Sequence, residues 1–177
     1  YKNLIAAFFN NDETRNNVNF YQKKTVKQIL IYNENNYLLY QIWQHLSIDV
    51  VGPLVKSNGC TYILNLIDLR SKYREAVPIT DTKSQTIIDH LERIFYRFGI
   101  PKTLSTDRAA YFESKTFSNW LQEQGIDHHL CPAHHHQSNG AIERNNSTLW
   151  DQLRTGCQNE NEWAFKIDKA NSDYNTS

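Results

Sequence analysis

The sequence predicts an α/β domain in which a five-stranded mixed sheet is flanked by helices. From residue 46 onward, short runs rich in β-branched and apolar residues alternate with longer segments whose apolar residues recur every three or four positions. Strong chain breakers separate them, such as the Ser-Asn-Gly of residues 57–59 and the Gly-Ile-Pro of residues 99–101. With 177 residues, 40% of them hydrophobic, the chain is long enough for one domain with its own core.

Each expected element follows from its local pattern. Five strands are expected, at residues 46–54, 61–69, 74–79, 102–107 and 126–131. The third contains Pro78 and therefore suits a sheet edge. Four helices are expected, at residues 81–99, 114–125, 140–156 and 161–174. Ser114 is a suitable N-cap for the second helix, and Gly125 is suited to end it. This order of strands and helices predicts a mixed sheet covered by helices.

Composition changes near residue 40. Residues 1–40 hold nine Asn and five Tyr but no Gly, Pro, Cys or His. We therefore interpret residues 1–40 as a flank or linker without zinc ligands, and residues 41–177 as the folded domain. The chain neither begins with Met nor contains one, which suggests a piece of a longer protein.

Charge and cysteine content exclude some classes of protein. Lys plus Arg and Asp plus Glu each number 19, so nucleic-acid binding would depend on local basic patches rather than on net charge. The three cysteines, Cys60, Cys131 and Cys157, form no C-x-x-C pair and favour a reducing compartment. No run of eighteen apolar residues is present, so no membrane partner is expected.

Three acidic residues stand out. Asp49 interrupts an apolar strand, Asp107 ends the short fourth strand, and Glu143 is expected in the first turn of a helix, opposite the apolar side of Ile142. Alone, each has a structural explanation: an exposed strand residue, a turn aspartate, and a glutamate favoured by the helix dipole. Together they predict an oxygen cage of the kind that Mg²⁺ prefers. Two such ions support phosphodiester chemistry without a covalent protein nucleophile.

A zinc site is the competing explanation of the His-rich region. It would use His128, His129, Cys131 and the histidines of residues 134–136. Neighbouring residues of a strand point to opposite faces, so His128 and His129 cannot both bind one ion. The spacing also matches no standard zinc module, which favours the carboxylates.

The region from about residue 41 to residue 177 resembles the integrase core of gypsy-type LTR retrotransposons and retroviruses. Six segments carry the resemblance, in order: residues 43–54, 62–79, 98–108, 111–117, 134–146 and 173–177. The resemblance implies an RNase H-like fold and a catalytic Asp, Asp and Glu with thirty-five residues between the last two, the spacing of Asp107 and Glu143 here. It therefore implies that Asp49, Asp107 and Glu143 are catalytic and bind Mg²⁺ or Mn²⁺, as two ions.

The same resemblance implies 3′-end processing and strand transfer of element DNA into target DNA. It also implies a homo-oligomer, for which Trp120 and Trp150 offer surface unless they belong to the core. The implied location is the nucleus, together with cytoplasmic element particles. The residues expected to contact DNA are Arg108, His135, Gln137, Ser138, Asn139 and Arg144. Lys72 and Arg74 are further candidates for phosphate contacts.

Several departures from the family leave alternatives open. Ala109 stands where the family has Gly, and it would be strained by about 1 kcal/mol if that position needed a positive φ. His134 and His136 replace the usual Tyr and Pro, which removes an aromatic surface for stacking on DNA. Residues 1–44 lack His and Cys, so the family's zinc domain is not expected there. The alternatives are a catalytically silent, domesticated integrase-derived DNA-binding or assembly protein, and an RNase H-type nuclease, which residues 137–146 disfavour.

Overall fold

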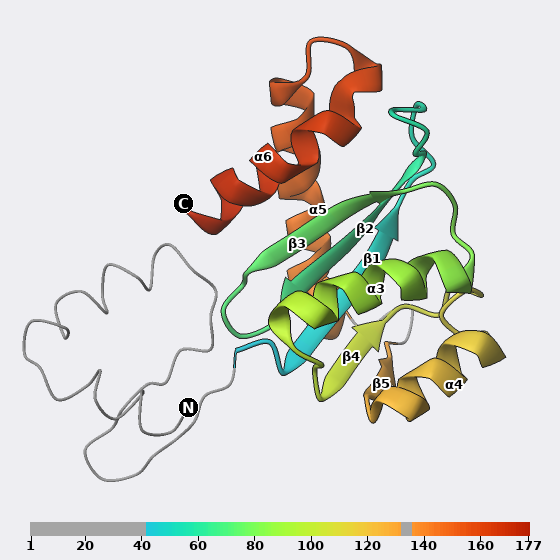
Figure 1. Ribbon diagram of the computed structural model, residues 1–177. Helices are drawn as coiled ribbons and strands as arrows, with labels where there is room; N and C mark the ends of the chain where they lie inside the picture. The colour runs from blue at the N-terminus through green and yellow to red at the C-terminus, as the bar shows by residue number, and fades with distance from the viewer. Residues whose placement is uncertain (1–41, 132–135) are drawn as a thin grey trace, which may run out of the picture. The chain divides into compact units, whose positions relative to one another are not determined.

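The computed structural model describes residues 42–131 and 136–177, and of residues 136–139 only the backbone. The expected N-terminal flank and His135 lie outside the described residues. The elements are β1 His45–Val51, β2 Tyr62–Asp68, β3 Arg74–Ile79, α3 Ser84–Phe98, β4 Thr103–Thr106, α4 Lys115–Gln124, β5 Asp127–Leu130, α5 His136–Gly156, a 3₁₀ turn Glu160–Glu162 and α6 Trp163–Asn175 (Figure 1). All five strands and four helices occur where the sequence predicted them, and none of these helices is long and apolar enough to span a membrane.

The strands form one mixed sheet in the order β3-β2-β1-β4-β5. β1, β2 and β3 pair antiparallel, whereas β4 pairs parallel with both β1 and β5. Asn58 and Gly59 close the β1–β2 hairpin with positive φ angles of 48° and 82°, as the Ser-Asn-Gly turn predicted. β3, which contains Pro78, lies at the edge, so that prediction is confirmed.

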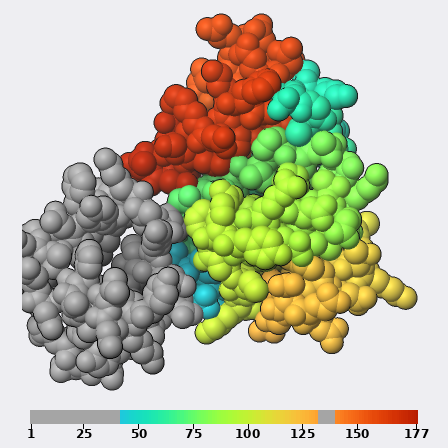
Figure 2. Space-filling model, viewed as in Figure 1, coloured from blue at the N-terminus to red at the C-terminus, as the bar shows by residue number. Residues whose placement is uncertain are grey.

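Helices cover both faces of the sheet, because the side chains of β2 alternate between two cores. Leu64 and Leu66 pack with α3 and α4, whereas Ile63 packs with α5 and α6. α3 covers much of the face turned toward the viewer in Figure 2. Trp120 belongs to the first core, while Trp150 on α5 is 36% exposed beside a cavity of about 560 Å³, so only Trp150 offers accessible surface.

The ends of α4 follow the expected capping chemistry. The Ser114 hydroxyl accepts a hydrogen bond from the Phe117 N–H at 3.1 Å, and Gly125 ends the helix in the left-handed conformation with φ 69°. Both predictions are confirmed.

Two asparagines of α6 cover the open edge of β3. The Asn171 side chain accepts from the Ala76 N–H at 3.2 Å and donates to the Ala76 carbonyl at 2.8 Å. Asn175 makes the same pair of bonds with the Arg74 backbone, both at 2.8 Å. Residues four apart on a helix thus bond to residues two apart on a strand. The outward backbone groups of Arg74 and Ala76 are satisfied without another strand.

The start of α5 differs from the expectation. The helix begins at His136 rather than at residue 140, so Glu143 does not lie in its first turn. Ser, Asn and Gly are weak helix formers, which is why Ser138, Asn139 and Gly140 suggested a loop. Propensity is a weak constraint at the end of a long helix whose later turns pack on the sheet. The helix dipole therefore does not explain Glu143.

Candidate active site

Asp49 and Asp107 lie level with each other on neighbouring strands. β1 and β4 run parallel, with Leu46 opposite Leu104 and Ser47 opposite Ser105. Asp49 lies two residues after Ser47 and is still within β1, and Asp107 lies two residues after Ser105, just past the end of β4. Because adjacent strands are about 4.8 Å apart, this register brings both aspartates to the same place at the sheet.

Glu143 approaches the same place from α5, which packs on β1 and β2. Burial raises the pKa of Asp49 above its usual value; the negative charges of Asp107 and Glu143 raise it further. Hydrogen bonds from Val50 and Asn146 oppose this rise. The three acids that the sequence singled out thus lie within electrostatic range of one another.

A tyrosine that sequence reasoning missed lies beside these acids. Burial, together with the charges of Asp107 and Asp49, raises the pKa of Tyr111 to about 12. Its phenol therefore keeps its proton at neutral pH and is available as a hydrogen-bond donor. Tyr111 begins the segment 111–117 that carries part of the family resemblance, but the absence of strand or helix periodicity there gave no reason to assign it a role.

A network of side-chain amides holds Asp49 in place. Oδ1 of Asp49 accepts from the Val50 N–H at 2.8 Å, and Oδ2 accepts from Nδ2 of Asn146 at 2.6 Å. Nδ2 of Asn65 donates to the side-chain oxygens of Asn145 at 2.7 Å and Asn146 at 2.6 Å. Asn65 lies opposite Asp49 on β2 and is fully buried. This network links β1, β2 and α5.

Sequence reasoning also missed Asn65, although a clue was present. Asn65, like Asp49, is a polar residue within an apolar strand, where an amide has to find hydrogen-bond partners. Its partners are some eighty residues away along the chain, so the pattern alone did not identify them.

Asp107 is held by its own turn. Its Oδ1 accepts from the Ala109 N–H at 3.1 Å. Ala109 is not among the residues with positive φ, which in the described part of the chain are Trp43, Asn58 and Lys72 besides four glycines. Alanine therefore causes no backbone strain at this position, and the expected cost of the missing glycine does not arise.

The acids have the right chemistry for a hard divalent cation, since all three supply carboxylate oxygens. Their mutual repulsion is the kind of unfavourable energy that a bound cation removes. Within the described ranges, however, no three His, Cys, Asp or Glu side chains lie close enough to bind one ion directly. Glu143 is exposed, and the described residues show no hydrogen bond or ion pair that fixes its carboxylate.

His128 and His129 lie in different surroundings on β5. The His128 ring packs edge-on against Phe117, and its Nε2 lies 2.9 Å from the Thr106 hydroxyl. Burial lowers the pKa of His128, and the neighbouring His129 lowers it further. His129 is exposed, as expected for the opposite side of a strand. Cys131 is a buried free thiol.

The residues expected to contact DNA have different positions. Arg108 and Arg144 are exposed, and Arg108 makes a loose ion pair with Glu113 at 3.9 Å. The backbone of residues 137–139 lies in the first turn of α5. Arg74, in contrast, is fully buried, so the suggestion that it contacts phosphate directly is wrong.

The fold and the acidic site together define an α/β domain with carboxylates gathered at its strand ends. The model of the integrase core domain matches residues 40–136, more than half of the chain. The chain belongs to the integrase core domain family, and hence to a group of polynucleotidyl transferases with an RNase H-like fold. The match includes Asp49 and Asp107 and ends before Glu143.

Similar proteins are polyproteins or much longer chains. An uncharacterised protein of Caenorhabditis elegans is 37% identical over 60% of this chain. The Pro-Pol polyprotein of simian foamy virus type 1 is 33% identical over 58%, and the Tf2-3 transposon polyprotein of Schizosaccharomyces pombe is 28% identical over 76%. The matching region spans 8%, 9% and 10% of these three relatives, respectively.

Proposed function

We propose that this chain is the catalytic core of a DNA integrase that processes the 3′ ends of element DNA and transfers them into target DNA. The observation that carries the proposal is the parallel register of β1 and β4, which places Asp49 level with Asp107, while Glu143 of α5 lies close enough for its charge to act on Asp49. Like charges gathered on the neighbouring strands β1 and β4 cost free energy, and a divalent cation offsets that cost. Membership of the integrase core family supports the same reaction class.

In this proposal Asp49, Asp107 and Glu143 hold Mg²⁺ or Mn²⁺, with two ions for the reaction. Ions held there would supply activation of a water or a 3′-hydroxyl and stabilisation of the departing oxygen. Asn146 orients the Asp49 carboxylate, and its amide favours the charged form of that carboxylate against the effect of burial. Tyr111 remains a neutral donor beside them.

The proposed partner is DNA, both element ends and target, bound by a homo-oligomer. Arg108 and Arg144 are exposed cations near the acids in sequence, suited to phosphate contacts. Gln137, Ser138 and Asn139 belong to the first turn of α5 and are proposed to approach the DNA there, together with His135. All of these assignments are testable by substitution.

Disintegration of a branched oligonucleotide with Mn²⁺ is the appropriate test, because this reaction depends least on domains outside the catalytic core. We expect the chain to be active and Glu143→Gln to be inactive. Glu123→Gln is the matched control, since Glu123 is also an exposed helical glutamate, on α4.

Two results would contradict this proposal. If folded wild-type protein binds Mn²⁺ but shows no activity, the chain is better described as a silent, integrase-derived DNA-binding or assembly protein. Cleavage of RNA–DNA hybrids in preference to DNA would instead favour an RNase H-type nuclease.

A further inference from the structure

A small cavity lies beside the N-terminal half of α5. Its volume is about 190 Å³, and its walls come from the end of β2, the β2–β3 turn, α5 and α6. The lining residues are Ile67, Lys72, Ala141, Arg144, Asn145 and Tyr174. None of the three acids of the proposed catalytic centre lines it, so it is a separate site.

Two cations line this cavity without a carboxylate partner. Within residues 42–131 and 136–177, neither Lys72 nor Arg144 forms an ion pair. Nζ of Lys72 donates one hydrogen bond, to the Leu69 carbonyl at 2.6 Å, and has two further protons. Two unpaired cations at one small cavity favour an anionic occupant.

Asn145 adds a buried donor to the same wall. The residue is 2% exposed, and its Oδ1 accepts from Asn65 at 2.7 Å. Its Nδ2 is buried and has no hydrogen-bond partner in the described protein. An unsatisfied buried amide costs free energy, and an acceptor placed in the cavity would remove that cost.

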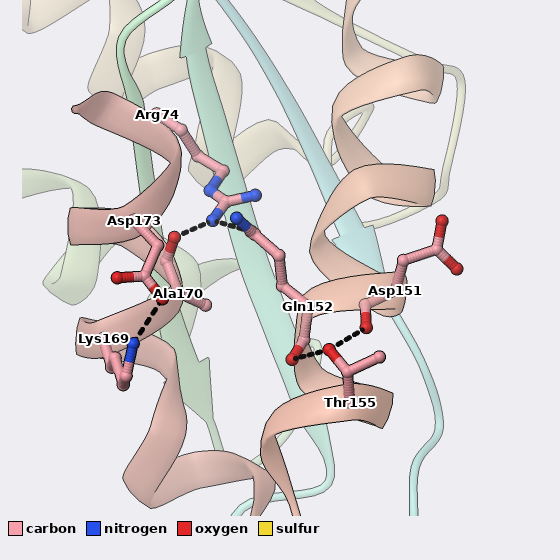
Figure 3. A network of polar contacts seen from close by, with 7 residues as sticks. All are labelled: Arg74, Asp151, Gln152, Thr155, Lys169, Ala170 and Asp173. Atoms are coloured by element: carbon pink, nitrogen blue, oxygen red, sulfur yellow. Dashed lines mark hydrogen bonds and ion pairs between the residues drawn. The ribbon is translucent and has the colours of Figure 1, made fainter. Parts of the chain in front are cut away.

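Arg74 supplies positive charge behind this wall. Its guanidinium lies 4.4 Å from the centre of the Tyr174 ring. It donates to the Ala170 carbonyl and to Gln152 at 2.7 Å (Figure 3). It also donates to Asn171 at 3.2 Å, and all three acceptors are neutral. Burial lowers the pKa of Arg74 to about 10, and Tyr174 alone offsets this shift. The guanidinium is therefore a buried positive charge whose three hydrogen-bond acceptors carry no charge.

We propose that this cavity binds a phosphate group. Lys72, Arg144 and the Asn145 amide all donate hydrogen bonds, and a phosphate offers several oxygens that accept them. An arginine can bind two phosphate oxygens at once, with charge-assisted bonds. The phosphate comes either from a nucleic-acid backbone or from a free phosphate or phosphomonoester. The inference uses no metal and no reaction step, so it stands apart from the proposed catalysis.

The test is a titration of the full chain with inorganic phosphate in metal-free buffer, followed by NMR of the Asn145 side-chain amide and of the backbone amide of Ala141, which also lines the cavity and reports in the Asn145→Asp variant. Sodium chloride at equal ionic strength corrects for general salt effects. Arg144→Gln and Lys72→Asn each remove one cation, and asparagine tolerates the φ of 63° at position 72. Asn145→Asp keeps the oxygen that accepts from Asn65 but replaces the free amide with a second oxygen.

We expect saturable shifts in the wild type and an affinity about tenfold lower in each variant. Arg93→Gln is the matched control, because Arg93 is an exposed arginine on α3, across the sheet. A short DNA duplex distinguishes the two sources. If it shifts the same amide and competes with phosphate, the group is a backbone phosphate. If phosphate binds without competition, the group is a free phosphate or phosphomonoester.

Two results would overturn the inference. One is an Asn145 amide that responds to neither phosphate nor duplex. The other is a wild-type response that all three variants retain unchanged. Because the buffer contains no metal and no reaction is followed, neither result bears on the proposed catalytic centre, and only the DNA contact proposed for Arg144 is shared between the two proposals.

Discussion

The side-chain amide of Asn146 donates a 2.6 Å hydrogen bond to Oδ2 of Asp49, across 97 residues of sequence. The bond joins α5 to β1 beside the proposed metal site. It favours the charged carboxylate, whereas burial favours the protonated form. Asn146 thus acts on the ionisation of Asp49 without being an acid or base itself.

Replacing Asn146 by alanine should therefore raise the pKa of Asp49 further, because burial and repulsion would act with less opposition. We expect disintegration activity to fall by about tenfold or more, as for other residues that orient metal ligands. Carboxyl ¹³C NMR measures the pKa. Ser147→Ala, an exposed neighbour on α5, should change neither quantity. An unchanged pKa in Asn146→Ala would mean that the hydrogen bond does not stabilise the carboxylate.

The stability of the chain should depend on pH through Asp49. Its folded pKa lies above the unfolded value of 3.8, so the folded state binds the proton more tightly. This tighter proton binding stabilises the folded state in full below pH 3.8. The stabilisation is lost as the pH rises through the folded pKa of Asp49. Glu143→Gln removes one repelling charge and should lower that pKa. Each unit by which it falls adds about 1.4 kcal/mol to the stability at neutral pH.

Urea unfolding of the wild type and Glu143→Gln at pH 7 and near pH 3 tests this linkage. The variant should be the more stable protein at pH 7, and the difference should shrink at the lower pH. An equal difference at both pH values would show that Glu143 does not act on the ionisation of Asp49.

Mg²⁺ should raise the unfolding temperature by relieving the repulsion among the acids. At a free concentration one hundred times the dissociation constant, binding contributes about 2.7 kcal/mol. We expect Asp107→Asn to lose this gain, and a chelator to abolish it in the wild type. Asp127→Asn, at an exposed acid that begins β5, should keep it. If Asp107→Asn is stabilised as much as the wild type, the ion binds elsewhere.

Asn65→Leu should destabilise the fold although the two side chains have the same number and branching of heavy atoms. The substitution leaves the side-chain oxygens of Asn145 and Asn146 without their donor. A buried acceptor that loses its donor costs about 1–3 kcal/mol, which chemical denaturation can resolve. Asn119→Leu, at an exposed position of α4, is the control. A stability equal to the wild type would show that the network contributes no net free energy.

Asn171→Ala should expose the edge of β3. The Ala76 N–H and carbonyl lose their partners, which we expect to cost about 1–3 kcal/mol. An uncovered edge also promotes association between chains, so light scattering should increase. Phe165→Ala changes a side chain of α6 that is 66% exposed, and it should shift stability by less than about 0.5 kcal/mol. Similar stabilities in the two variants would contradict this role of Asn171.

Local patterns in the sequence determined the elements and the fold class. Alternation and helical periodicity reflect which side chains each segment must bury, and turn residues such as Asn58 and Gly59 adopt their conformation without distant partners. Two features of the sequence indicated one acidic site: the spacing between Asp107 and Glu143, and the presence of Asp49 in an otherwise apolar strand. These features are readable because each depends on only a few neighbouring residues.

Only the tertiary structure determined which residues lie next to one another and which are hydrogen-bond partners. The register of β1 and β4 places Asp49 level with Asp107, and the packing of α5 brings Asn146 to Asp49. The structure shows that Arg74 is buried, unlike the exposed arginines Arg108 and Arg144. It also shows that Lys72 and Arg144 line the same cavity. Hydrogen-bond partners and burial depend on residues far apart along the chain, and no local pattern encodes those distances.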